Sequence, residues 1–123
     1  RVIKLSNEIK VTVGLSCTNG NLIVNVSPAT IQVDQTTAKG GGPASVDVGT
    51  SEETIGFGDI TPRYLFVKNL DATNFVDIGF STGVYGISLL AGETGVFPLK
   101  SGATVYAKAD TAECTVQFIA LNA

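Results

Sequence analysis

One motif in this chain has the residue types and spacing of a catalytic site. Residues 79–83 read Gly-Phe-Ser-Thr-Gly, which fits the Gly-x-Ser-x-Gly pattern of a nucleophile elbow. That elbow requires a helix after the serine and a histidine that takes the proton of the serine hydroxyl. The chain has no histidine, and no helical pattern follows Gly83. We therefore interpret Ser81 as a loop residue and expect no enzymatic activity.

Acidic residues offer a second kind of chemistry. Four carboxylates could in principle act in pairs: Asp59, Asp71, Asp77 and Glu93. A glycosidase would also need a sugar-sized cleft with aromatic platforms, but the chain has no Trp and its three tyrosines are scattered. Calcium bound by loop carboxylates is an alternative, although Asp71 is more typical of a turn that closes through side-chain-to-backbone hydrogen bonds. We expect neither a cofactor nor a metal.

The two cysteines, Cys17 and Cys114, lie far apart in the sequence and match no zinc or redox motif. One interpretation is that both are buried free thiols that act as small apolar residues. The alternative is a disulfide that ties the first hairpin of the chain to its last strands.

Composition limits the class of protein. The chain has 123 residues, enough for one domain with an arm, and 44% of them are hydrophobic. Only 15% are charged, whereas about 25% is usual for a soluble domain. A weakly charged and fairly apolar surface predicts that part of it is covered by a partner or by other copies of the chain.

The distribution of charge and hydropathy excludes two kinds of partner. The net charge is −3, and the eight basic residues are scattered along the chain without forming a stripe. We therefore expect no nucleic-acid partner. No run of residues approaches the roughly 18 apolar positions of a membrane span, so we expect no membrane partner.

The stretches with strand-like alternation begin with a hairpin. Its apolar residues are Val11, Val13, Leu15 and Cys17 before the turn and Leu22, Val24 and Val26 after it. Between them stands Asn19-Gly20, the preferred pair of a type I′ turn. A turn centred there would pair Cys17 with Leu22, Leu15 with Val24, and Val13 with Val26. The apolar side chains of both strands would then share one face.

The sequence predicts three regions. Pro28 is expected to end the second strand, with a short edge strand over 31–34. Residues 36–43 read Thr-Thr-Ala-Lys-Gly-Gly-Gly-Pro and are typical of a flexible linker. We therefore predict an N-terminal β-hairpin arm over 1–35, a glycine-rich linker over 36–43 and a β-sandwich body over 44–123. Because an isolated hairpin is marginal in water, the arm must pack on the body or on a neighbouring subunit.

The body is expected to contain eight strands, near 44–48, 54–57, 64–70, 75–80, 86–90, 96–99, 104–109 and 114–121. Within 75–80, Val76, Ile78 and Phe80 are expected to face the same way. The last two strands are expected to form a hairpin that pairs Ala109 with Cys114, Ala107 with Val116 and Val105 with Phe118. This pattern predicts an all-β fold, either an antiparallel β-sandwich or a jelly-roll-like barrel.

Part of the body resembles a known group of proteins. The phrase Thr-Pro-Arg-Tyr-Leu-Phe-Val-Lys-Asn-Leu-Asp-Ala-Thr-Asn-Phe-Val at 61–76 resembles small structural proteins of tailed-bacteriophage particles. The Ala-Gly-Glu turn at 91–93 and the strand Val-Tyr-Ala-Lys-Ala-Asp-Thr-Ala at 105–112 extend the similarity over about the second half of the chain. The resemblance does not extend to the N-terminal arm.

The resemblance implies a structural role and a set of partners. It implies a virion protein, assembled in the host cytoplasm, that decorates and cements the phage head as a homotrimer bound to the major capsid protein. A phage tail or fibre protein and a β-sandwich module that binds carbohydrate or cell surfaces remain as alternatives. The candidate contacts with other copies or with the capsid are exposed apolar or aromatic side chains: Val2, Ile3, Ile23, Ile31, Tyr106, Ile119 and Leu121.

Overall fold

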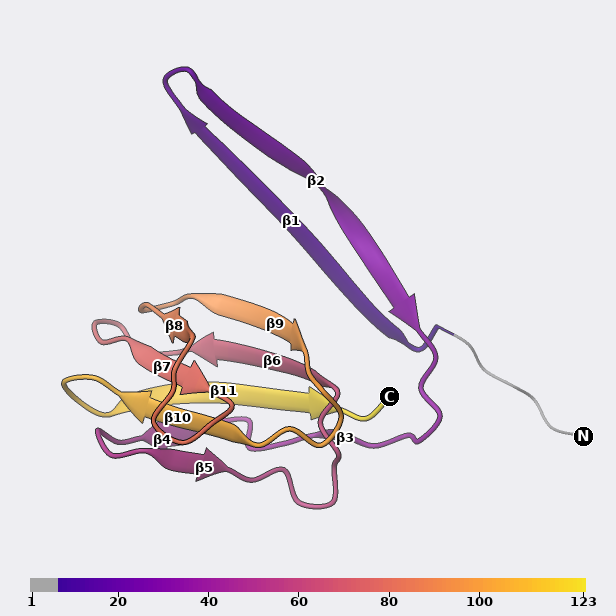
Figure 1. Cartoon of the computed structure of the whole chain (residues 1–123), viewed down its shortest axis with the longest axis vertical. Coiled ribbons are helices and arrows are strands. Elements are labelled where there is room, and N and C mark those ends of the chain that lie inside the picture. The colour runs from indigo at the N-terminus through magenta and orange to yellow at the C-terminus, as the bar shows by residue number, and fades with distance from the viewer. Residues whose placement is uncertain (1–6) are drawn as a thin grey trace, which may run out of the picture. The chain divides into compact units, whose positions relative to one another are not determined.

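The computed structural model describes residues 7–123, and all of their regular structure is β-strand (Figure 1). The predicted all-β class is confirmed. Contacts within the chain divide it into two compact units. The first contains the residues up to Thr36 together with Ala123, and the second is Thr37–Asn122. Val2 and Ile3, two of the expected contact residues, lie outside the described residues.

The first unit is a long antiparallel hairpin made of β1 (Ile9–Asn19) and β2 (Leu22–Val33). The hairpin exists as predicted, but its turn is centred on Gly20 and Asn21, because Asn19 pairs with Leu22. Gly20 has a φ of 57° and Asn21 has no positive φ, the pattern of a type II′ turn, in which glycine takes the first central position. The expected pairs are therefore wrong by two residues: Cys17 lies opposite Val24, and Leu15 lies opposite Val26.

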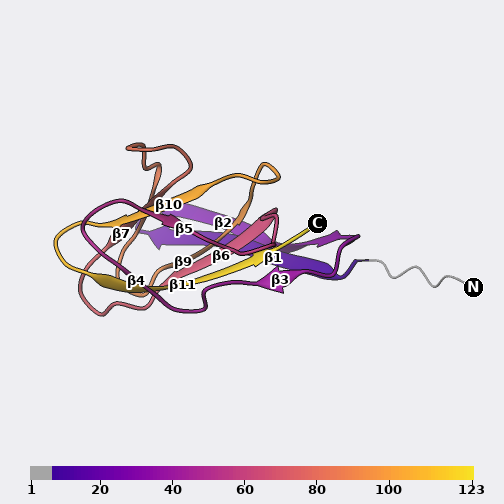
Figure 2. The same cartoon turned by 90° about the horizontal axis from the view of Figure 1, so that it is seen from below.

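The second unit consists of two antiparallel sheets, which Figure 2 shows as two layers of the body. The first sheet has the strand order β5 (Glu53–Ile55), β10 (Val105–Ala109), β7 (Val76–Gly79) and β8 (Ile87–Leu89). The second has the order β3 (Gly40–Gly41), β11 (Cys114–Leu121), β6 (Tyr64–Asn69) and β9 (Thr94–Pro98), and β4 (Val46–Val48) also pairs with β11. The body is therefore sandwich-like.

The core of the body is filled by alternate residues of the strands. In β11, Cys114, Val116, Phe118 and Ala120 are fully buried, while the residues between them are half-buried. In β7, Val76 and Ile78 are fully buried as predicted. Phe80 follows the end of that strand and is exposed, so the expectation that it faces the same way as Val76 and Ile78 is wrong.

All eight strands predicted for the body exist, each within two residues of its expected bounds. The inward residues predicted for the last two strands are also correct, but the predicted pairing of these two strands is wrong. β10 pairs with β5 and β7, whereas β11 pairs with β3, β4 and β6. The chain between them crosses from one sheet to the other. Period-2 alternation identifies the buried face of a strand but not the strand beside it, so both arrangements satisfy the sequence.

The glycine-rich segment is part of the body rather than a free linker. Gly40 and Gly41 form β3 and pair with Leu121 and Ala120 of β11. The Phe118 amide also donates to the Pro43 carbonyl, at 3.3 Å. Glycine is favoured at Gly42, because its φ is 138° and a Cβ there would lie 3.3 Å from the Phe118 carbonyl oxygen. The expectation of a flexible linker over 36–43 is therefore wrong for its second half.

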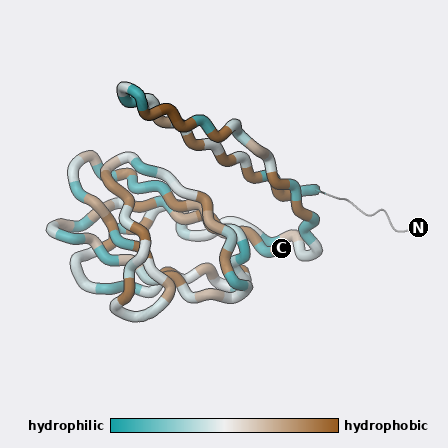
Figure 3. The backbone as a smooth tube through the Cα atoms, turned by 45° about the horizontal axis from the view of Figure 1, so that its top comes forward, coloured by the Kyte–Doolittle hydropathy of each residue, from teal (hydrophilic) through white to brown (hydrophobic). Residues whose placement is uncertain are grey.

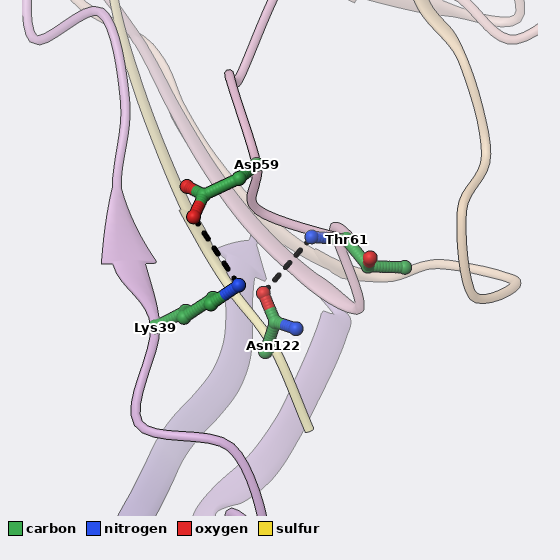
Figure 4. Close-up of polar contacts among 4 residues, drawn as sticks. All are labelled: Lys39, Asp59, Thr61 and Asn122. Atoms are coloured by element: carbon green, nitrogen blue, oxygen red, sulfur yellow. Dashed lines mark hydrogen bonds and ion pairs between the residues drawn. The ribbon is translucent and has the colours of Figure 1, made fainter.

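Polar contacts fasten the same end of the body (Figure 4). Lys39 Nζ lies 3.2 Å from a carboxylate oxygen of Asp59. The Thr61 amide donates to Asn122 Oδ1 at 2.9 Å, and the Asn122 amide donates to the Lys39 carbonyl at 3.1 Å. These contacts connect the segment before β3, the loop before β6 and the end of β11.

The turn over 69–74, inside the phage-like phrase, is built around a buried amide. Asn69 is fully buried, and its Nδ2 donates to the carbonyls of Asn74 and Leu89 at 2.9 and 3.0 Å. Its Oδ1 accepts from the Asp71 amide at 3.0 Å. The Asp71 carboxylate in turn accepts from the amides of Thr73 and Asn74 at 3.0 and 2.7 Å, which confirms the predicted turn.

Replacement of Asn69 tests how much this turn contributes to stability. Asn69→Ala removes the partners of two carbonyls and one amide, so the free energy of unfolding should fall by about 3 kcal/mol. Urea denaturation of the full chain measures the change, and Thr73→Ala serves as the control because its side chain is exposed. A loss below about 1 kcal/mol for Asn69→Ala would show that the network is not needed.

Asp71 should make the stability of the body depend on acid. Its hydrogen bonds from the Asn74 and Thr73 amides lower the pKa of the Asp71 carboxyl from its ordinary value. A lowered pKa means stabilisation that is present above the unfolded pKa of about 4 and is lost as the pH falls through the folded pKa. Asp71→Asn should therefore lose less stability than the unmodified chain between neutral pH and pH 3. Parallel denaturation curves at both pH values test this, and equal losses would contradict it.

Candidate interaction surface

The hairpin of the first unit carries an irregularity that decides which residues share a face. The regular register is broken between Val13 and Leu15, where Ser27 and Pro28 of β2 lie opposite Gly14 alone. This is a β-bulge, with one extra residue in β2. The expectation that Pro28 ends the strand is wrong, because the bulge is a position where a residue without an amide hydrogen is tolerated within a sheet. A Cβ at Gly14 would lie 3.2 Å from Pro28 Cγ, so glycine leaves room for the proline ring.

Because of the extra residue, the apolar residues of β2 on both sides of the bulge lie on the same face of the hairpin. Before the bulge the even-numbered residues of β2 pair with the odd-numbered apolar residues of β1; after it the odd-numbered residues do so. Without the bulge, Ile31 and Val33 would lie on the side of the sheet opposite Val24. With it, one face of the hairpin, flanked by Ile9 at the base and Asn19 beside the turn, carries Val11, Val13, Leu15, Cys17, Leu22, Val24, Val26, Ala29, Ile31 and Val33. We call these residues the apolar face.

Most of the apolar face is exposed. Leu15 exposes 66% of its surface, and Leu22 and Val26 expose 55% each. Only Val11 and Val33, at the base of the hairpin, are half-buried. Figure 3 shows hydrophobic colouring along both strands of the hairpin. A hairpin has no second sheet to cover such a face, so the face is available to a partner.

The opposite face of the hairpin is polar, with a single exception. It carries Lys10, Thr12, Ser16, Thr18, Asn25, Thr30 and Gln32. The hydroxyls of Thr12 and Thr30 lie 2.9 Å apart across the strands. The exception is Ile23, which pairs with Thr18 and exposes 71% of its surface. Ile23 and Ile31, both expected contacts, therefore lie on opposite faces, and only Ile31 belongs to the apolar face.

Lys10, at the base of the hairpin, is the only charged residue in β1 and β2. Between Lys10 and Asp34 the sequence contains no acidic or basic residue. Natural proteins usually protect exposed strands with charged side chains that discourage association. Here no such protection exists over the whole apolar face, so a partner would meet no charge that must be desolvated or paired.

The remaining expected contact residues lie on the body and do not form one surface. Tyr106 is half-buried in β10, where it pairs with Thr54 and Gly79. Ile119 and Leu121 are half-buried in β11, which belongs to the other sheet. All three alternate with core residues and so face outward, but from opposite sheets of the body. The prediction that Val13, Leu15, Cys17, Leu22, Val24 and Val26 share one face of the hairpin is confirmed. The continuation of this face through Ala29, Ile31 and Val33 was not predicted, because the bulge interrupts the simple alternation.

The Gly-x-Ser-x-Gly motif lies in a turn. The Val84 amide donates to the Ser81 carbonyl at 3.1 Å, and the chain continues towards β8 instead of a helix. A Cβ at Gly79 would meet the Val84 carbonyl oxygen, so this glycine has a packing role. Glu52 holds the turn by accepting from the Gly83 amide and from the Tyr85 hydroxyl. The hydrogen bond to Glu52 raises the pKa of Tyr85 to about 12, while the bond from Tyr85 lowers the pKa of Glu52.

The two cysteines have different environments. Both are free thiols, Cys114 buried in the body and Cys17 exposed on the apolar face. The prediction of buried free thiols is therefore correct for Cys114 and wrong for Cys17. Burial raises the pKa of the Cys114 thiol, whose sulfur lies 3.5 Å from the Phe75 carbonyl oxygen. Within residues 7–123, no three acidic or cysteine side chains are close enough to hold a metal ion, and no helix is long and apolar enough to cross a membrane.

The bulged register can be tested with engineered cysteines on the polar face. In a Cys17→Ser background, Thr12→Cys with Thr30→Cys should form an internal disulfide under mild oxidation, because these residues lie opposite each other. Thr12→Cys with Ala29→Cys is the control, since this pair would lie opposite each other in a hairpin with the same turn but no bulge. Mass spectrometry of the oxidised chains reads out both. A disulfide between positions 12 and 29, and not between 12 and 30, would contradict the bulge.

Comparison of the chain with protein-family models, with curated protein sequences and with solved structures found no match. The function proposed below is therefore supported by the surfaces described above and by the resemblance of residues 61–76.

Proposed function

We propose that this chain is a structural protein of a bacteriophage particle, and that it decorates and cements the phage head through protein–protein contacts. It acts as a homotrimer bound to the major capsid protein, and its site of action is the virion. The observation that carries the proposal is the exposed, uncharged apolar face of the hairpin, which fits a protein that works by associating with others. The resemblance of residues 61–76 to phage particle proteins supports the choice of particle.

The architecture of the body supports a structural role. Its strands are short and closely joined, and their inner faces are filled by aliphatic side chains and Phe118. The one buried polar side chain among the described residues is that of Asn69, and its hydrogen bonds hold the turn over 69–74. The Asp71 carboxylate accepts from backbone amides of its own turn, and the Glu52 carboxylate accepts from the Gly83 amide of the turn between β7 and β8. Such a body is suited to hold its shape while its surface makes contacts.

A carbohydrate-binding module is less well supported by the same structure. Such modules present aromatic platforms to the sugar. Tyr64 is buried in β6, and the Arg63 guanidinium lies 4.8 Å from the centre of its ring. Tyr85 is hydrogen-bonded to Glu52, and Tyr106 is half-buried in a strand. The three tyrosines therefore do not offer a shared exposed platform.

Cryo-electron microscopy of the phage particles that carry the chain tests the proposal. A decoration protein should give density in groups of three on the outer surface of the head, and heads without it should break at lower temperature than heads to which the purified chain has been added back. Density confined to the tail or fibres would replace the decoration role with the tail alternative. Absence of the chain from purified particles would overturn the proposal altogether.

A further inference from the structure

The apolar face of the hairpin needs an occupant, and several features of the chain restrict what that occupant can be. A two-stranded sheet is marginal in water unless its apolar side is covered. The occupant must therefore be present whenever the hairpin is folded. It must also be uncharged where it touches the hairpin, because no charge lies between Lys10 and Asp34 to pair with one.

Another copy of the same face meets both conditions. It is present wherever the chain is present, and it is apolar and uncharged along its whole length. Each face exposes apolar surface on the order of 500 Å², near the upper end of what monomeric proteins leave uncovered. Two such faces together bury about 1,000 Å², which reaches the area expected of a specific interface.

The distribution of exposure along the hairpin indicates the relative direction of the copies. Every residue of the apolar face between Val13 and Ile31 is exposed, from 39% for Val24 to 66% for Leu15 among the large side chains, while Val11 and Val33 at the base are half-buried. Hairpins that point the same way place tip against tip and cover the surface that most requires it. Closed cyclic symmetry about an axis along the hairpins has this geometry.

We propose that the apolar face packs against the same face of other copies of this chain, with the hairpins pointing in the same direction. The inference deepens the proposed function, since it names the segment that joins the copies of the trimer, but it holds for association in solution without any capsid. It also places Cys17 of one copy close to Cys17 of another, because Cys17 lies on this face near the tip.

Two adjacent residues of β2 provide a matched test. Val24 lies on the apolar face and Ile23 on the polar face, and both are β-branched aliphatic residues. Val24→Asp would bury a carboxylate between copies and should raise the dissociation constant roughly a hundredfold or more, whereas Ile23→Asp should change it less than about threefold. Sedimentation equilibrium of the full chain measures both, against multiples of the 12.7 kDa monomer.

A crosslinking experiment needs no change to the interface. Diamide takes up two electrons and two protons from a pair of thiols and leaves a disulfide. In the unmodified chain it should join copies through Cys17, and Cys17→Ser should abolish the product while association persists. The control, Cys17→Ser with Thr18→Cys, moves the thiol to the polar face and should crosslink at least about tenfold more slowly, because exposed thiols there meet only by collision.

The outcomes separate this inference from the proposed function. Three results would each overturn the packing of the hairpins. One is a chain that stays monomeric at 100 μM, about a hundred times a micromolar dissociation constant. The others are association that survives Val24→Asp and equal crosslinking from positions 17 and 18. A dimer that shows the expected crosslinks would support the packing and contradict the trimer of the decoration proposal. Failure to find the chain on phage heads would leave the packing of the hairpins untouched.

Discussion

An apolar sheet face must be covered, and this single requirement governs both units of the chain. The body satisfies it internally: two sheets turn their inner faces towards each other, and the residues between them are fully buried. The hairpin consists of one sheet of two strands, so its apolar face has no second layer of its own. The same pattern of alternate apolar residues that fills the core of the body leaves an exposed apolar face on the hairpin.

Much of the body could be predicted from the sequence, because alternation reports burial directly. The strands of 105–109 and 114–121 have their inward residues where the pattern puts them. The partner of each strand could not be predicted in the same way, since Val116 is equally well buried whether it pairs with Ala107 or with Asn69 and Val46. Pairing is decided by how loops carry the chain between the two sheets, and a single sequence gives little information on that.

The hairpin shows why local rules can identify an element and still misplace its residues. Asn19-Gly20 correctly indicated a tight turn, but the glycine occupies the first central position instead of the second. Pro28 predicts a strand end because proline cannot donate to a ladder, yet at a bulge the missing amide hydrogen is tolerated. The shared face of Leu15, Val24 and Val26 follows from alternation alone, whereas the place of Ile31 on that face follows only from the bulge.

The bulge at Pro28 also has a consequence for how the chain can vary. Substitutions along the hairpin change one side chain at a time, and an apolar residue can replace another with little loss of the face. A gain or loss of one residue between Gly14 and Pro28 would instead move every later side chain of β2 to the other face of the hairpin. The arm should thus tolerate changes of residue type while the number of its residues stays fixed. Natural selection would have to preserve the register of the two strands more than any one side chain.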